Sequence, residues 1–420
     1  MNGRSDLILK GVKQMNARSL FFCLLTATCT MVACGASVTV DAVRTRYPWN
    51  ALVDVDYTVS GIDNPGDYAL KLTVSATVDG SVRSWQVQKF AGALACDLPT
   101  HNGSHRITWD AAADGALFAA DDVAAQIDLV YAPCDPAGAD YLVVDLSPGP
   151  DATEYPVRYL KGQSPSDFNL DCYKTTKLVM KRIKACGFWM GISSLPKPTH
   201  DYPAYRYVEL THDYYLGLFE VTQRQYALVM GENPSRFAEA SESARRPVES
   251  VSWNALRAED GFISRMRTRS KYAGNALSGM NLPTEAQWER AARGAYPTWS
   301  WISGNNFVSK GDYSWLGTNS DGRTHVVGTR PSVQSWGFYD IVGNVAEYCL
   351  DYSYHSSNLV PGTPEAPDRD PCTVSGTSVV TKGAGWDCTR DDYIRVDRRY
   401  PYDPSLPYKT TGLRLAYTCP

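Results

Sequence analysis

The chain has 420 residues with a formal charge of −4 at pH 7, and 44% of its residues are hydrophobic and 20% charged. This length predicts about two or three domains, and the composition excludes long disorder as the dominant state. The sequence contains no run of basic residues that would indicate nucleic-acid binding. The 26 tyrosines and 11 tryptophans fit either loops anchored by aromatic packing or a groove for sugars or peptides.

Residues 1–36 are expected to be a signal peptide. A positive start at 15–18 precedes a short apolar run at 20–32, which is too short to cross a bilayer. Met15 begins the more conventional signal sequence, so residues 1–14 read as an upstream start extension. We favour cleavage after Ala36, with lipid attachment at Cys34 as the alternative. The mature chain is therefore expected to be secreted, periplasmic or on the cell surface, with no transmembrane span.

Removal of this leader leaves an even number of cysteines. In an oxidising compartment such cysteines tend to pair, so we expect most of them to form disulfides, in a connectivity that the sequence does not give. The remaining cysteines are Cys96, Cys134, Cys172, Cys186, Cys349, Cys372, Cys388 and Cys419.

Residues 37–150 are predicted to form an all-β sandwich. The segment 70–78 alternates apolar and polar residues and ends at the turn residues Asp79 and Gly80. Similar segments occur at 52–59, 82–90, 105–109, 126–131 and 141–146, a spacing typical of an antiparallel sandwich. We interpret this part as an immunoglobulin-like or fibronectin-like module that serves adhesion or spacing, or is a passive stalk.

Glycine and proline at 147–151 indicate a break, and residues 151–176 are expected to be a linker. The part from 177 to 420 contains short helices with clear ends, including a predicted helix at 252–267. Two capping boxes predict helix starts, and a glycine follows each: Thr222 with Gln225 before Gly231, and Thr284 with Gln287 before Gly294.

Seven sequence blocks in this part occur in the order of a known domain. They are FWMG (188–191), YLGLFEVTQRQY (215–226), RPVESVSW (246–253), LPTEAQWERAARG (282–294), GFYDIVGNVAEY (337–348), GAGW (383–386) and GLRL (412–415). This part resembles the formylglycine-generating-enzyme (sulfatase-modifying factor) domain. The resemblance implies an irregular α+β fold of the C-type-lectin type for 177–420.

Members that are generating enzymes resemble copper oxidases, in which two cysteines five positions apart hold copper(I) and a sulfatase cysteine is converted to formylglycine. Two soft thiolates are needed to hold the ion and exchange one ligand for substrate. Here Cys388 matches the first cysteine, but Tyr393 stands at the second position. We therefore expect no working copper site. The alternative is an active oxidase that recruits Cys349 or Cys372 as the second ligand.

The family also carries a structural calcium ion at the segment matching 337–348. The resemblance implies carboxylate oxygens from Asp340 and Glu347 and main-chain oxygens from Gly343 and Val345, and hard oxygen ligands suit calcium. The other interpretation is that this segment is held by hydrogen bonds alone. An iron site is not expected, because the six histidines show no helical ligand spacing.

Trp386, Arg390 and Tyr393 match the segment that lines the substrate groove of the generating enzymes, where they could stack on a ligand and pair with carboxylates. We therefore predict a non-catalytic binding or scaffold protein outside the cytoplasm. Its partner would be a peptide, protein or glycan. The alternative is a formylglycine-generating oxidase that acts on sulfatase cysteines.

Overall fold

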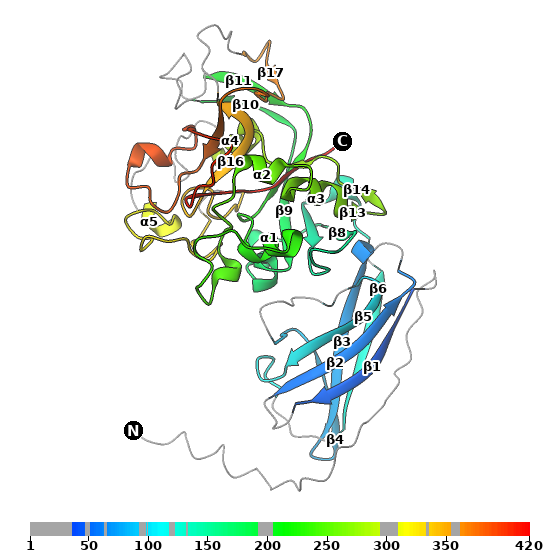
Figure 1. Cartoon of the computed structure of the whole chain (residues 1–420). Helices are drawn as coiled ribbons and strands as arrows, with labels where there is room; N and C mark the ends of the chain where they lie inside the picture. The colour runs from blue at the N-terminus through cyan, green and yellow to red at the C-terminus, as the bar shows by residue number, and fades with distance from the viewer. Residues whose placement is uncertain are drawn as a thin grey trace.

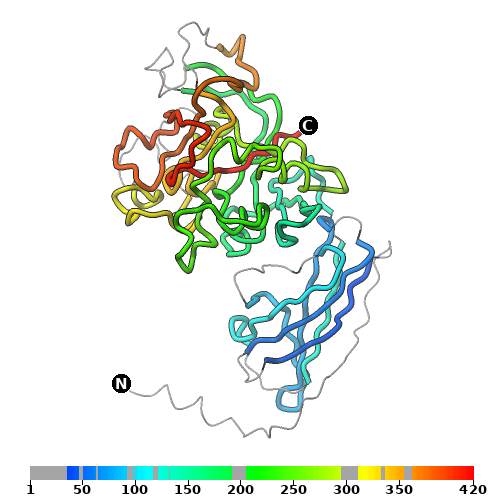
Figure 2. The backbone as a smooth tube through the Cα atoms, viewed as in Figure 1, coloured from blue at the N-terminus to red at the C-terminus, as the bar shows by residue number. Residues whose placement is uncertain are grey.

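The computed structural model describes residues 36–46, 51–62, 65–91, 98, 100–116, 122–131, 133–191, 205–294, 310–332, 336–353 and 362–420. Figure 1 shows a slender amino-terminal body made of strands and a larger, more irregular carboxy-terminal body. The smooth trace in Figure 2 shows that the chain passes from the first body to the second without returning. In the described part, none of the helices combines the length and apolar character that crossing a bilayer requires.

The first body consists of two three-stranded antiparallel sheets. One sheet has the order β1-β2-β5 and the other β4-β3-β6. Their bounds are β1 (Ser37–Thr45), β2 (Leu52–Ser60), β3 (Tyr68–Val78), β4 (Ser81–Gln86), β5 (Gly103–Asp110) and β6 (Val123–Tyr131). The short helix η1 (Pro65–Asp67) precedes β3.

Alternation along these strands builds one shared core. Val53 and Val55 of β2 and Leu72 and Val74 of β3 are all buried in the same apolar cluster, so the two sheets face each other. Trp109 of β5 is fully buried there. The predicted β-rich module is therefore present, while its assignment as immunoglobulin-like or fibronectin-like stays a prediction.

The predicted turn joins β3 to β4. Asp79 and Gly80 have φ angles of 53° and 77°, and Val78 pairs with Ser81 across the turn. Positive φ at both central residues gives a two-residue turn the twist that a hairpin needs, and Asp-Gly tolerates it well.

The second body is built on an eight-stranded sheet with the order β14-β13-β8-β7-β9-β12-β21-β15. Its strands are β7 (Tyr141–Asp145), β8 (Tyr155–Leu160), β9 (Lys177–Ile183), β12 (Tyr214–Gly217), β13 (Ser270–Tyr272), β14 (Asn275–Ala276), β15 (Met280–Asn281) and β21 (Ala416–Thr418). One apolar cluster lies on each side of this sheet: Leu142, Val144 and Met180 contribute to one, and Tyr141, Val143 and Val179 to the other.

In the described part of this body, two smaller sheets and five α-helices complete the fold. The sheets are β10-β11-β17 and β19-β18-β16-β20. Their strands are β10 (Cys186–Met190), β11 (Arg206–Leu210), β16 (Ala346–Ser353), β17 (Asp368–Arg369), β18 (Ser378–Lys382), β19 (Tyr400–Tyr402) and β20 (Thr411–Gly412). The helices are α1 (Gln223–Met230), α2 (Trp253–Arg257), α3 (Phe262–Arg269), α4 (Glu285–Arg293) and α5 (Lys310–Tyr313). Further 3-10 turns are η2 (Pro136–Gly138), η3 (Pro165–Phe168), η4 (Asp171–Lys174), η5 (Ser243–Arg245) and η6 (Asp391–Ile394).

The helix caps agree with the sequence. Thr222 and Gln225 form a capping box at the start of α1, and Thr284 and Gln287 form one at the start of α4. The helix predicted over 252–267 is instead two helices, α2 and α3. The chain bends between them at Gly261, where an added Cβ would lie 2.4 Å from the carbonyl oxygen of Ala255, so only glycine allows this close packing.

The boundary between the bodies lies earlier than the sequence suggests. The strand at 141–146 was expected in the sandwich, but β7 pairs with β8 and β9 of the eight-stranded sheet. The expected linker at 151–176 contains β8, η3 and η4, so it belongs to the folded carboxy-terminal body. Alternation predicts a strand but not the sheet that it joins, because that depends on distant partners.

Candidate functional site

A buried ion pair holds the segment 337–348 in place. Arg414 donates from Nη2 to Glu347 Oε1 at 2.6 Å and from Nε to both carboxylate oxygens at 3.0 and 3.1 Å. The indole of Trp288 donates to Glu347 Oε2 at 2.6 Å. Both charged side chains are fully buried. Such a pair survives burial only because nearly every polar atom has a partner.

Two further carboxyl groups lie beside this pair. Glu220 accepts from Asn344 Nδ2 at 2.7 Å and from the Val345 amide at 3.0 Å. Burial, and then the neighbouring carboxylate of Asp340, raises the pKa of Glu220 well above its usual value. Asp340 accepts from the Gly328 amide at 2.6 Å, while its Oδ1 is buried without a hydrogen-bond partner in the described part of the chain. Burial raises the pKa of Asp340 to about 6.

These contacts bear on the calcium prediction. Glu347 gives both oxygens to Arg414 and Trp288, so it could bind a cation only by giving up those bonds. Gly343 and Val345 are buried, and their amides bond to Gly383 and Glu220. These amide bonds leave the carbonyl oxygens of Gly343 and Val345 unaddressed, so the calcium site at this segment stays a prediction. In the ranges that the structure describes, no group of three or more His, Cys, Asp or Glu side chains is placed to hold a metal.

A second buried charge cluster was not anticipated from the sequence. Glu289 of α4 accepts from Arg293 Nη2 at 2.6 Å and from Lys382 Nζ at 3.1 Å, and Arg399 donates to Glu285 at 2.6 Å. Burial alone would raise the pKa of Glu289, but Lys382 and Arg293 outweigh it and hold that pKa at about 2. The charges on helix α4 were visible in LPTEAQWERAARG, but their partners on β18 and beyond are remote in sequence.

Trp386, predicted to line a groove, is mainly a packing residue. Its side chain is only 7% exposed, and the ring of Phe237 lies edge-on to it with the centroids 5.5 Å apart. The ammonium group of Lys409 lies 5.3 Å from its ring centre, and its Nε1 donates to the Lys409 carbonyl at 3.1 Å. The ring therefore offers little open face to a ligand.

Arg390 and Tyr393 belong to a partly exposed cluster, which we call the Tyr393 cluster and define as Cys388, Arg390, Asp392, Tyr393 and Arg398; Arg390 is its exposed member and Arg398 is buried. The guanidinium groups of Arg390 and Arg398 lie 4.4 and 3.9 Å from the Tyr393 ring centre. Asp392 pairs with Arg390 at 3.0 Å. The side chain of Arg390 is 63% exposed, so it is open to a ligand.

Cys388 lies at the edge of this cluster as a free thiol. Its Sγ lies 3.5 Å from the carbonyl oxygen of Arg390, to which it donates. Burial raises its pKa, which makes it a poorer thiolate source than an exposed cysteine. The position that a second copper ligand would occupy carries the ring of Tyr393, which has no sulfur.

The expectation that most cysteines pair is wrong for the described residues. Cys172 is disulfide-bonded. The free cysteines are Cys134, Cys186, Cys349, Cys372, Cys388 and Cys419.

The alternative in which Cys349 or Cys372 serves as a second ligand beside Cys388 stays a prediction, and the surroundings of these free thiols bear on it. Cys349 is fully buried, so it has no access to an open groove. Burial raises its pKa well above the usual value, and the neighbouring charges come from Asp351 and Glu285. Burial raises the pKa of Cys372 to about 12, again beside Asp351. Cys388 has Asp387 and Asp392 as its acidic neighbours and packs against the apolar cluster that contains Cys349.

Several known proteins are similar to parts of this chain. The chaperone protein LppX of Paenibacillus barcinonensis is 29% identical over 214 residues, which cover 41% of this chain and 69% of that protein. The formylglycine-generating enzyme of Thermomonospora curvata is 33% identical over 185 residues, covering 40% of this chain and 55% of that enzyme. The inactive C-alpha-formylglycine-generating enzyme 2 of Bos taurus is 29% identical over 178 residues, covering 40% of this chain and 50% of that protein. The chain thus spans about half the length of the last two.

Among solved structures, Treponema denticola variable protein 1 aligns with a TM-score of 0.47 and 27% identity, covering 58% of this chain and 96% of that one. The family model described as the sulfatase-modifying factor enzyme 1-like domain matches residues 174–419, which is more than half of the 420 residues. The charge network and the sequence blocks lie within that match, and the chain belongs to this family.

Proposed function

We propose that this chain is a non-catalytic, extracytoplasmic binding or scaffold member of the family. One observation carries the proposal: Cys388 is a free thiol whose neighbour at the second ligand position is the ring of Tyr393. When a substrate thiol displaces one ligand of a two-thiolate site, the second thiolate still holds the copper(I) ion. A site with a single thiolate lacks that second ligand. These residues do not fit the copper centre that the family's oxidases use, and no reaction step is derived through it.

The Tyr393 cluster is the surface that we assign to binding. The guanidinium groups of Arg390 and Arg398 both lie against the Tyr393 ring, and Arg390 is the one exposed to solvent. Guanidinium groups pair with carboxylates and stack on rings, so this surface suits an acidic peptide, a protein or a glycan with a carboxylate. The sandwich would then serve adhesion or spacing, or act as a passive stalk.

The metal test uses the purified mature chain. We expect it to bind no stoichiometric copper(I) in competition with a chromogenic chelator, and to consume no oxygen with a cysteine-containing sulfatase peptide. The variant Tyr393→Cys places a sulfur five positions after Cys388 and should gain copper affinity, while Tyr393→Cys with Cys388→Ser should not. Tight copper binding with oxygen consumption by the unaltered chain would refute the proposal.

The binding test uses arrays of glycans and acidic peptides. Arg390→Ala should weaken a specific signal at least tenfold, because it removes the exposed guanidinium group. Arg369→Ala, which alters another exposed arginine on β17, should leave the signal unchanged. Calcium per chain, counted on the same sample after dialysis, tests the calcium prediction separately.

A further inference from the structure

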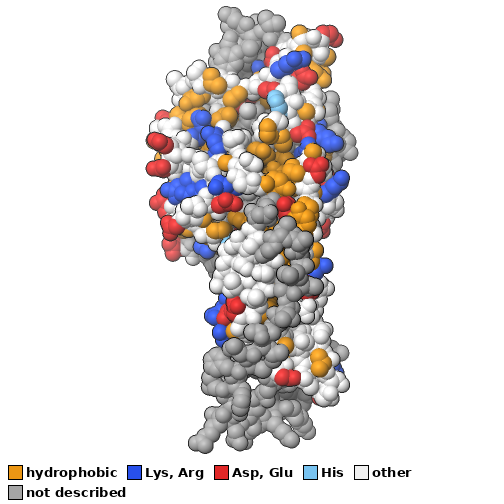
Figure 3. Space-filling model, turned by 90° about the vertical axis from the view of Figure 1, so that its right-hand side faces the viewer, with side chains coloured by type: hydrophobic (Ala, Val, Ile, Leu, Met, Phe, Trp, Pro, Cys, Tyr) orange, Lys and Arg blue, Asp and Glu red, His pale blue; other side chains and the backbone are white. Residues whose placement is uncertain are grey.

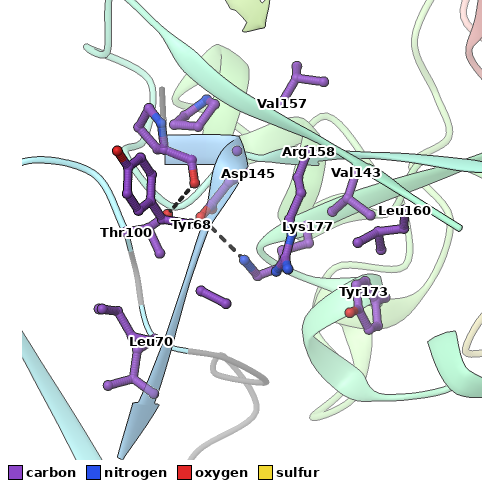
Figure 4. Close-up of a pocket in the computed structure, with 15 residues that line it drawn as sticks. Tyr68, Leu70, Thr100, Val143, Asp145, Val157, Arg158, Leu160, Tyr173 and Lys177 are labelled. Atoms are coloured by element: carbon purple, nitrogen blue, oxygen red, sulfur yellow. Dashed lines mark hydrogen bonds and ion pairs between the residues drawn. The ribbon is translucent and has the colours of Figure 1, made fainter. Parts of the chain in front are cut away.

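A small pocket lies at the junction of the two bodies. It has a volume of about 70 Å³, and both bodies line it. Figure 4 shows Tyr68, Leu70 and Thr100 of the sandwich on one side and Arg158 and Lys177 of the carboxy-terminal body on the other. The residues that line the pocket are distant in sequence from the Tyr393 cluster, and none of them belongs to the site that the family resemblance predicts.

Close contacts on both sides fix this junction. An added Cβ on Gly66 would lie 2.0 Å from the carbonyl oxygen of Val157, so the two backbones touch there and only glycine fits. Tyr272 donates to Asp67 at 3.2 Å. Pro156, Arg158 and Leu160 share the less buried face of β8, and this face forms the pocket wall. The pocket between the bodies is therefore defined by specific contacts on both sides.

The volume limits what can bind. A water molecule needs roughly 10–15 Å³ of such space, so the pocket has room for about five to seven waters. It is well below the roughly 300 Å³ of an ordinary ligand pocket, which excludes a sugar chain or a peptide. An anion of four or five heavy atoms, such as acetate or phosphate, matches this size.

The charges favour an anion. Asp145 pairs with Lys177 Nζ at 3.3 Å and accepts from the Ser147 amide at 2.9 Å. Burial would raise the pKa of Asp145, but the charge of Lys177 and the Ser147 bonds outweigh it, so the pKa is lowered. Asp145 is therefore ionised at neutral pH and balances Lys177.

Arg158 has no such balance. Its Nε is buried without a hydrogen-bond partner, and no carboxylate pairs with it within the ranges described. A buried donor without an acceptor costs roughly 1–3 kcal/mol, and more when it is charged. A guanidinium group binds carboxylate and phosphate oxygens through paired, charge-assisted hydrogen bonds. One positive charge thus faces a cavity of the size of a small oxyanion.

We propose that the junction pocket binds one small oxyanion, a carboxylate or a phosphate, through Arg158. Because both bodies line the pocket, the bound anion stabilises their contact.

The test titrates the full mature chain with acetate and with phosphate by calorimetry, at an ionic strength held constant with chloride. We expect saturable binding of at least one anion and a higher unfolding temperature in its presence. Arg158→Gln should weaken that binding at least tenfold. Arg83→Gln, at an exposed arginine on the far strand β4, is the matched control and should bind as the unaltered chain does.

The arms separate the two anion classes. Binding of acetate alone indicates a carboxylate ligand, and binding of phosphate alone indicates a phosphate. If neither anion binds more tightly than chloride, or if Arg158→Gln binds as well as the unaltered chain, the proposal is overturned. Should Arg158→Gln fail to fold, Arg158→Lys decides: it keeps the charge but loses the planar fork, so acetate or phosphate binding should fall at least threefold, and unchanged binding overturns the proposal.

Discussion

Replacing Arg414 with methionine is expected to destabilise the carboxy-terminal body strongly. Arg414 bonds to Glu347 at 2.6 Å and to the carbonyls of Gly217 and Tyr339 at 2.9 Å each. After the change, Glu347 keeps only the indole donor of Trp288 for its buried charge. Breaking one side of a buried pair costs about 3–5 kcal/mol, a large part of the roughly 5–15 kcal/mol that stabilises a typical domain.

Urea unfolding followed by tryptophan fluorescence measures this loss. The control is Arg369→Met, which breaks an exposed pair with Glu209 and should cost less than about 1 kcal/mol. Adding Glu347→Gln to Arg414→Met removes the stranded charge and should recover about 1–3 kcal/mol. The reasoning is refuted if Arg414→Met costs no more than the surface control, or if the two changes at the pair simply add.

Three other outcomes are expected. The pKa of Asp340 is raised to about 6, so the stability that its protonated form contributes is complete below pH 4 and is lost as the pH rises through 6. Asp340→Asn should therefore gain up to about 3 kcal/mol of unfolding free energy at pH 8 and nothing at pH 4. A constant difference between the two proteins across this pH range would contradict the raised pKa. Cys388 should react with an alkylating agent more slowly at pH 7.5 than a model thiol does, because burial raises its pKa. Peptide mapping measures the rate, and Cys388→Ser identifies the modified peptide. A rate equal to that of the model thiol would count against the burial of Cys388. Tyr272→Phe removes the hydrogen bond to Asp67 and should lower the stability of the junction by about 1 kcal/mol. In thermal unfolding, the two bodies should then separate at a lower temperature than in the unaltered chain. An unchanged unfolding profile would show that the bond contributes nothing.

Local signals in the sequence located much of the fold. The capping boxes at Thr222 and Thr284 depend on residues three positions apart, so they could be read directly and are present in the structure. The hairpin turn at Asp79 and Gly80 is equally local. Alternation correctly predicts the β7 strand but places it in the wrong sheet, because nothing local in the sequence indicates that β8 and β9 are its partners.

The candidate site was harder to predict because its contacts are distant in sequence. The resemblance predicts Glu347 as a calcium ligand, but it does not reveal the partner Arg414, which lies 67 residues away in the GLRL block. The resemblance predicts Trp386 at a groove, and it gives no sign of the edge-on contact with Phe237, which comes from a distant loop. The cysteine prediction used only compartment and parity, neither of which measures the distance between two sulfurs.

The position of β21 in the eight-stranded sheet has a consequence for the order of folding. Residues 416–418 lie between β12 and β15 and provide hydrogen-bond partners for both. Contacts between residues so remote along a chain form slowly. On a growing polypeptide the sandwich, whose partners are all nearby, can become native early. Until β21 is synthesised, the edges of β12 and β15 that it will pair with stay unpaired. Unpaired strand edges favour aggregation, so the carboxy-terminal body is most prone to aggregate during that interval.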